Sequence, residues 1–176
     1  MAKIPALQWA EFQSSVAHLD TSAKPLVTLK AILFWLRKYP NAFGGEIDRA
    51  YRFQLYRTID ESLFPVDWSE LSPAELEKFR HTVIKYRADQ AEGIARLLRD
   101  RLEDLLIVEK GQECPNCERW GLGIYFDRQK DTIAYECKQC GYAAYPDGTP
   151  VAAGRLSLAG TEDLMNAGIL IRSNDS

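Results

Sequence analysis

The sequence predicts an α+β protein with an N-terminal helical domain over residues 1–109, a small β module over residues 110–150 and a C-terminal extension over residues 151–176. Two observations predict this division. Apolar residues recur at helical spacing as far as Val108, whereas from Gly111 the chain is rich in turn residues and alternates apolar with polar positions. All four cysteines lie in the second part, which indicates that this part has its own means of stabilisation.

The first two expected helices lie before Pro40. From Ile4 to Leu19 the apolar positions follow roughly helical spacing, which predicts the first helix. The second is expected to begin near Lys24 or Pro25, because proline suits the first helical turn, where its missing N–H group would have no partner. Pro40 is expected to end it.

A third helix is expected after a loop at residues 41–45, and Pro65 would stop it. Its apolar residues recur at every fourth position and would form one buried stripe, comprising Ile47, Tyr51, Leu55, Ile59 and Leu63. The same segment contains three arginines, Arg49, Arg52 and Arg57. We expect them on the solvated sides of the helix rather than in a nucleic-acid interface.

The clearest helix start is the sequence Ser72-Pro73-Ala74-Glu75. Ser72 can cap the first turn, and Glu75, three residues later, can complete a capping box. The apolar stripe that follows continues to about Val108 and predicts one long helix, which Gly93 would kink or divide.

The four cysteines form two CxxC pairs, Cys114-Pro-Asn-Cys117 and Cys137-Lys-Gln-Cys140, separated by 19 residues. Each pair can form a tight turn whose two thiolates point the same way, and two such turns complete the tetrahedron that zinc prefers. We therefore expect Cys114, Cys117, Cys137 and Cys140 to bind one structural zinc ion. Four cysteine ligands leave no position for water or a substrate, so the ion would hold the module's shape rather than catalyse a reaction.

The segment between the two pairs is expected to be a β-hairpin. Apolar side chains alternate over residues 122–126, residues 127–131 read as a polar turn, and residues 132–136 return as a second strand. With its two CxxC turns, the chain resembles the zinc ribbon family over residues 112–146. The resemblance implies the ribbon fold but not a function.

In the zinc ribbon family, a glycine usually follows the second cysteine of each pair. Gly141 fits this pattern after Cys140, whereas Glu118 follows Cys117 and the nearest glycine is delayed to Gly121. The first turn is therefore expected to be distorted, or wider than the second.

Redox chemistry or disulfide bonding is the alternative role for these cysteines. The first pair also resembles the CPxC dithiol of glutaredoxin-like proteins. A redox pair should open a helix after a strand, because the helix N-terminus lowers a thiol pKa, but this pair precedes a strand pattern. The redox alternative would also leave the second pair unexplained.

The C-terminal extension is expected to contain one short helix. The sequence Thr161-Glu162-Asp163 can open this helix and Gly168 can end it. Residues 169–171 would follow as an apolar strand or packing strip.

No catalytic signature accompanies the cysteines, so neither an enzyme activity nor a small-molecule substrate is expected. His18 and His81 lie in no metal or nucleophile motif, and the sequence has no phosphate-binding glycine loop and no HExxH helix. The N-terminus has no signal-peptide pattern, and no apolar run reaches the roughly 20 residues of a membrane span. We therefore expect a cytoplasmic protein without a membrane partner.

The expected function is non-enzymatic protein binding. The net charge is −3, and neither half of the chain is a basic block of the kind that gives affinity for phosphates. In size, acidic balance and lack of catalytic motifs the chain resembles bacterial immunity proteins, which implies a toxin domain as the partner. The alternative is a nucleic-acid-binding or transcription-linked regulator that uses the zinc ribbon. Such a protein would need the basic residues Arg128, Lys130 and Lys138 to cluster beside exposed aromatic residues.

Overall fold

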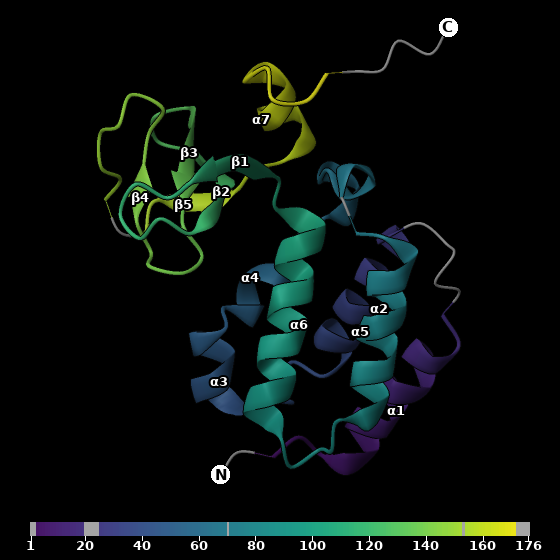
Figure 1. Ribbon diagram of the computed structural model, residues 1–176. Helices are drawn as coiled ribbons and strands as arrows, with labels where there is room; N and C mark the ends of the chain where they lie inside the picture. Colours follow the sequence, from purple (N-terminus) through teal and green to yellow (C-terminus); the bar gives the residue numbers. More distant parts are fainter. Residues whose placement is uncertain (1–2, 20–24, 70, 153, 172–176) are drawn as a thin grey trace, which may run out of the picture. The chain divides into compact units, whose positions relative to one another are not determined.

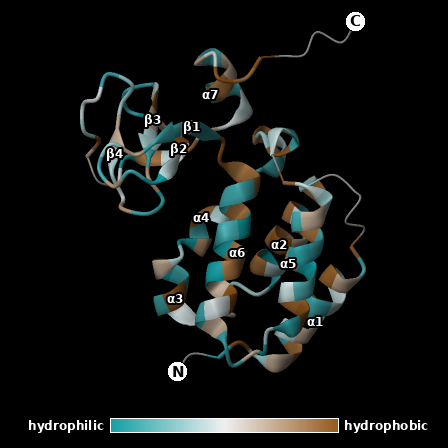
Figure 2. Cartoon of the chain, in the orientation of Figure 1, coloured by the Kyte–Doolittle hydropathy of each residue, from teal (hydrophilic) through white to brown (hydrophobic). Residues whose placement is uncertain are grey.

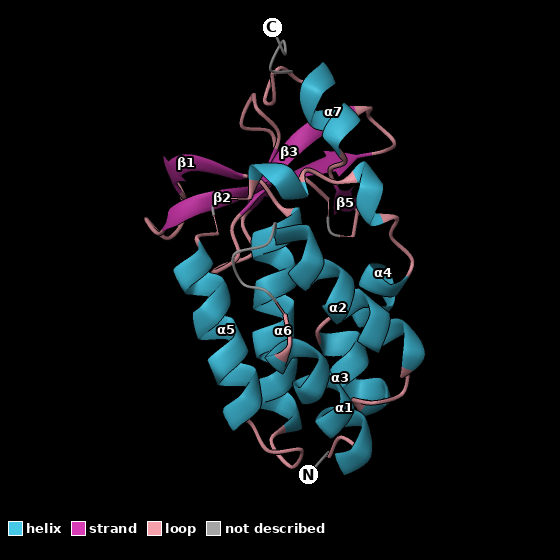
Figure 3. Cartoon of the chain, turned by 90° about the vertical axis from the view of Figure 1, so that its right-hand side faces the viewer, coloured by secondary structure: helices cyan, strands magenta, loops and turns pink. Residues whose placement is uncertain are grey.

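The computed structural model (Figure 1) has two compact units, each with its own core. The helical unit comprises Met1–Glu61 and Val66–Leu105, and the β unit comprises Ser62–Pro65 and Leu106–Ser176. The residues that the structure describes are 3–19, 25–69, 71–152 and 154–171. The α+β class predicted from the sequence is confirmed, and the strands all belong to the β unit (Figure 3).

Six α-helices and two short 3-10 helices precede the strands among the described residues, and all but most of η1 belong to the helical unit. In chain order they are α1 (Ala6–Ala17), α2 (Pro25–Lys38), α3 (Gly44–Ala50), α4 (Phe53–Arg57), η1 (Glu61–Leu63), η2 (Val66–Trp68), α5 (Pro73–Lys85) and α6 (Ala91–Leu106). On α6, hydrophilic and hydrophobic residues lie on different sides (Figure 2), because apolar side chains at helical spacing are buried. None of the described helices combines the length and the apolar character that crossing a membrane requires.

Aromatic residues form the centre of the helical unit. The Trp9 ring lies 5.4 Å from that of Phe12 and 5.9 Å from that of Trp35. The two indole N–H groups are satisfied inside this core, because Trp9 Nε1 donates to the Tyr86 carbonyl and Trp35 Nε1 to the Gln8 carbonyl, both at 2.8 Å. This unit therefore has a packed core that contains no cysteine.

The prediction of one continuous third helix is wrong, because the segment folds as α3, α4 and η1. Arg52 breaks it, because this residue takes the left-handed conformation with φ 57°. The break carries Phe53, which lies outside the expected apolar stripe, into the core, where its ring centroid is 4.8 Å from that of Phe43. Arg57, expected on a solvated side, is mostly buried and forms an ion pair with Asp48.

The expected long helix is two helices, α5 and α6. The capping box at its start is confirmed, since the Glu75 backbone N–H donates to Ser72 Oγ and the Ser72 N–H donates to the Glu75 carboxylate. The chain leaves the helix at Tyr86 rather than at Gly93, which lies inside α6. A Cβ atom on Gly93 would lie 2.8 Å from the Tyr86 ring, so the glycine allows close packing instead of making a kink.

The described residues of the β unit form one antiparallel sheet and a short helix that follows it. Its elements are β1 (Glu109–Glu113), β2 (Trp120–Asp127), β3 (Thr132–Glu136), β4 (Ala143–Ala144), β5 (Leu156–Leu158) and α7 (Thr161–Asn166). The strand order is β1-β2-β3-β4, and β5 also pairs with β2. The expected hairpin is confirmed as β2 and β3, whose register runs from Gly123 opposite Glu136 to Asp127 opposite Thr132.

The C-terminal segment packs into the same unit as the hairpin. The expected short helix is present as α7, and β5 extends the sheet. Residues 106–176 therefore form one unit, in place of a module over residues 110–150 and a separate extension over residues 151–176. Residues 169–171 form no strand: Leu170 is buried in the core of the β unit, and Ile171 is exposed. Residues 172–176 lie outside the described part of the chain.

Candidate metal centre

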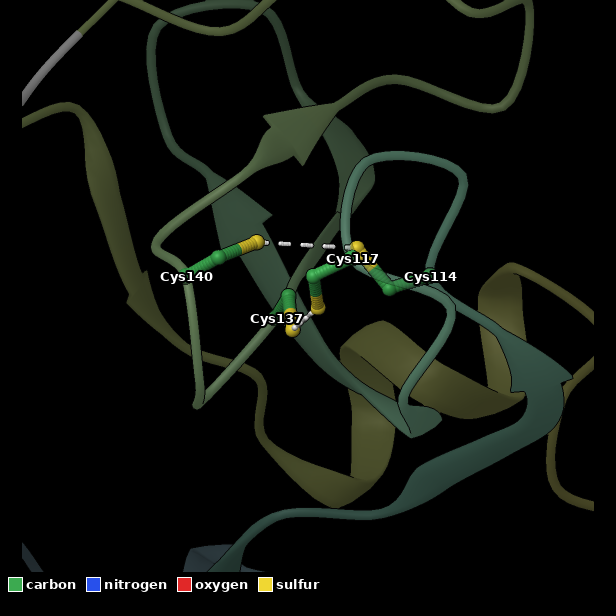
Figure 4. Close-up of side chains that lie close together, drawn as sticks. All are labelled: Cys114, Cys117, Cys137 and Cys140. Atoms are coloured by element: carbon green, nitrogen blue, oxygen red, sulfur yellow. Dashed lines mark hydrogen bonds between the residues drawn. The ribbon is translucent and has the colours of Figure 1, made fainter.

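Four sulfur atoms converge between two turns of the β unit (Figure 4). The Sγ atoms of Cys114 and Cys140 are 3.7 Å apart, those of Cys117 and Cys137 are also 3.7 Å apart, and all four lie within 4.8 Å of one another. In a tetrahedron with metal–sulfur bonds of about 2.3 Å, the sulfur atoms are about 3.8 Å apart. The spacing therefore fits one metal ion and is far wider than a disulfide bond of about 2 Å.

The second turn, from Cys137 to Tyr142, follows β3 directly. The Gly141 N–H donates to the Cys137 carbonyl at 2.9 Å, and the Cys137 N–H donates to the Tyr142 carbonyl at 2.8 Å. Gly141 has φ 70°, a conformation that glycine adopts without steric cost. The Tyr142 N–H also donates to the sulfur of Cys140, so the backbone both shapes the turn and orients one ligand.

The first turn, which follows β1, has the same backbone pattern. The Glu118 N–H donates to the Cys114 carbonyl at 2.9 Å, the Cys114 N–H donates to the Arg119 carbonyl at 2.8 Å, and the Arg119 N–H donates to the Cys117 sulfur. The expected distortion is therefore wrong. Glu118 itself takes the left-handed conformation, with φ 59°, that Gly141 takes in the second turn.

Replacing Glu118 by glycine is expected to raise the metal affinity of the protein up to about fivefold. The left-handed conformation costs a residue other than glycine roughly 1–2 kcal/mol, and glycine avoids this cost. Glycine loses more backbone entropy on folding, however, which offsets part of the gain. Competition titration of zinc against a chelator measures the change. Gly141→Ala is the matched control and should lower the affinity, and an unchanged affinity in both variants would contradict the argument.

Each turn contributes one buried and one outward cysteine. Cys114 and Cys137 directly follow β1 and β3, are each 1% exposed, and pack in the core of the β unit with residues such as Ile124. Cys117 is half-buried and Cys140 is exposed. The sheet thus fixes the first ligand of each pair, and the turn positions the second.

The thiols of Cys140 and Cys117 differ in how readily they lose a proton. The Asn116 side chain and the Tyr142 backbone N–H both hydrogen-bond the Cys140 sulfur and lower its pKa to about 6. The Arg119 N–H lowers the pKa of Cys117, but burial and the three neighbouring thiols outweigh it and raise that pKa to about 12. A bound cation would stabilise all four as thiolates, the form in which cysteine ligates a metal.

The three cations expected for a nucleic-acid surface do not form an unpaired basic patch. Arg128 makes a bidentate pair with Asp163, at 2.8 and 2.7 Å, and Lys138 Nζ lies 2.9 Å from Glu109. Lys130 lies over the Tyr145 ring, 3.8 Å from its centroid. Their charge is therefore largely satisfied within the β unit.

The two histidines do not join the cysteine cluster. His81 pairs with Glu77 on α5 at 2.8 Å, and His18 is exposed at the end of α1. Two residues of the β unit were not anticipated from the sequence: Asn116, which contacts the Cys140 sulfur from the other turn, and Asp127, a buried carboxylate at the far end of the β2–β3 hairpin. Asn116 could have been identified from the sequence, because it lies inside a CxxC pair.

Comparison of the chain with protein-family models, with curated proteins and with solved structures finds no match.

Proposed function

We propose that the four cysteines bind one structural zinc ion, and that the protein is a non-enzymatic protein-binding protein whose β unit is stabilised by this ion. The observation that carries the proposal is the convergence of four Sγ atoms within 4.8 Å from two turns of matching hydrogen-bond pattern. Thiolates in a tetrahedral arrangement select zinc or iron. Zinc is proposed because a closed four-cysteine site of this kind is typical of zinc ribbons.

The role assigned to the ion is structural because the four thiolates complete its coordination shell. Binding of a zinc ion by four ligands adds on the order of 10 kcal/mol to the folding free energy of small zinc modules. The ion would therefore hold the two turns, and with them the exposed surface next to the first turn, in one conformation.

An exposed surface beside the metal centre supports a protein partner. Trp120 begins β2, directly after the first turn, and is 69% exposed. Its neighbour Arg119 is also exposed, and tryptophan and arginine are the residues most enriched in interface hot spots. The finer proposal is an inhibitor of the toxin-immunity type, and the net charge of −3 favours a basic toxin domain as its partner.

The proposal is tested on the full chain in two linked measurements. Native mass spectrometry with elemental analysis should find one zinc ion per chain; iron, or no metal, would contradict the metal assignment. Tagged protein should then capture the same protein partner from a nuclease-treated lysate. Trp120→Ala should lose this partner, whereas Trp68→Ala, which changes a 42% exposed tryptophan of the helical unit, should keep it.

The identity of the captured molecule decides the remaining question. A toxin domain would support the immunity form of the proposal. Recovery that disappears after nuclease treatment would replace protein binding with nucleic-acid binding.

A further inference from the structure

We propose that Cys140 is an oxidation site for peroxides, and that its oxidation joins it to Cys114 in a disulfide bond that opens the metal centre. The inference rests on the proposed metal centre. Metal-bound cysteines are thiolates, the nucleophilic form of the side chain, so access to the oxidant decides which sulfur reacts first. Cys140 is the exposed member of the four, whereas Cys114 and Cys137 are each 1% exposed.

Two close sulfur–sulfur contacts join one turn to the other. Cys140 Sγ lies 3.7 Å from Cys114 Sγ, and Cys117 Sγ lies 3.7 Å from Cys137 Sγ. Cys114 is too buried to meet the oxidant but close enough to attack an oxidised Cys140. A disulfide between these two residues would keep the two turns connected after the metal has left.

The two steps balance with a peroxide as the oxidant. The Cys140 thiolate attacks one peroxide oxygen: an S–O bond forms, the O–O bond breaks, and hydroxide leaves, giving a sulfenic acid. The Cys114 thiolate then attacks the Cys140 sulfur, so that an S–S bond forms, the S–O bond breaks, and a second hydroxide leaves. The two sulfurs lose two electrons, which reduce the peroxide, and the two thiolates that remain are too few to hold the ion.

Disulfide mapping on the zinc-loaded full chain tests the proposal directly. The protein is treated with hydrogen peroxide, blocked with N-ethylmaleimide at intervals and digested with trypsin without reduction, while a chromogenic chelator follows zinc release. Cleavage after Lys138 separates Cys137 from Cys140, and peptide 111–119 carries the first pair. We expect the first disulfide crosslink to join Cys114 to Cys140, and we expect it to form at the same rate as zinc is released. A first crosslink within either CxxC pair would overturn the proposal.

Two histidine variants form a matched set, because histidine can replace cysteine as a zinc ligand. Cys140→His removes the exposed sulfur and should slow peroxide-induced zinc release roughly tenfold. Cys114→His keeps Cys140, which should then accumulate as the sulfenic acid that dimedone traps. Release from Cys140→His at the wild-type rate would refute the assignment.

The outcomes separate this inference from the proposed function. A chain isolated without metal would refute the metal centre itself. A chain that holds one zinc ion and keeps it, without a Cys114–Cys140 crosslink, would refute only the oxidation site. If either histidine variant fails to bind zinc, the crosslink map of the wild-type chain still shows whether Cys114 and Cys140 are joined first.

Discussion

Replacing Cys137 by serine is expected to unfold the β unit while the helical unit stays folded. Cys137 is 1% exposed within the apolar core, so the variant loses a metal ligand and buries a hydroxyl group among apolar side chains. A structural zinc ion contributes about 10–16 kcal/mol, as much as the whole stability of a typical domain, about 5–15 kcal/mol. Limited proteolysis read by mass spectrometry should show new cleavages after residue 106 and no new cleavages within residues 1–61 and 66–105.

Chelation and two further variants control this experiment. A strong zinc chelator should reproduce the cleavage pattern in the wild-type chain, and zinc should restore protection. Cys140→Ser removes an exposed ligand and should also lose the metal, whereas His81→Gln, which changes a side chain outside the cluster, should change neither metal content nor cleavage. A β unit that remains protected after chelation would show that it folds without the ion.

The convergence of the four cysteines was predictable because the arrangement that produces it is local in the sequence. Each CxxC pair encodes a turn, and the alternating residues between the pairs encode the β2–β3 hairpin that brings the turns together. The backbone of the first turn was not predictable from its residues. Glu118 is a poor choice for a left-handed position, yet the hydrogen bonds of the turn hold it there.

Elements fixed by distant contacts were missed. The sequence of β1, EKGQE, has no apolar alternation, and the strand exists because its backbone pairs with β2. The three-residue β5 is likewise defined by its pairing with β2. In the helical unit, burial of Phe53 outweighs the helical repeat that predicted one long third helix, because an aromatic core residue stabilises more than continued helix in an exposed segment.

Replacing Asp127 by asparagine is expected to lower the melting temperature of the β unit by roughly 5 to 10 °C, because the partly exposed Arg155 loses its counter-charge and the hydrogen bonds to the buried carboxylate are weakened. The Asp127 side chain is fully buried at the end of β2. It accepts a hydrogen bond from the Tyr145 hydroxyl at 2.5 Å and from the Gln129 backbone N–H at 2.9 Å, and Arg155 Nε lies 3.0 Å from it. Asparagine keeps the size of the side chain but leaves the Arg155 charge without its counter-charge. Differential scanning calorimetry measures the change.

The pH dependence of this loss distinguishes a carboxylate from a neutral acid at position 127. The Tyr145 hydroxyl, then the backbone N–H groups of Gln129 and Lys130, and Arg155 lower the pKa of Asp127 from its ordinary 3.8 to about 2. Because the folded pKa lies below the unfolded one, this stabilisation is complete above about pH 4 and is lost only as the pH falls through about 2.

Over pH 5.5 to 8, where thiolates can still hold the metal, the difference in melting temperature between the wild type and Asp127→Asn should therefore stay constant. Tyr145→Phe is the matched control: it removes one hydrogen bond, keeps the pair with Arg155, and should cost less at every pH. A difference that shrinks between pH 7 and 5.5 would mean that Asp127 takes up a proton there, and would contradict the hydrogen-bonded carboxylate that joins β2 to the segment carrying Arg155.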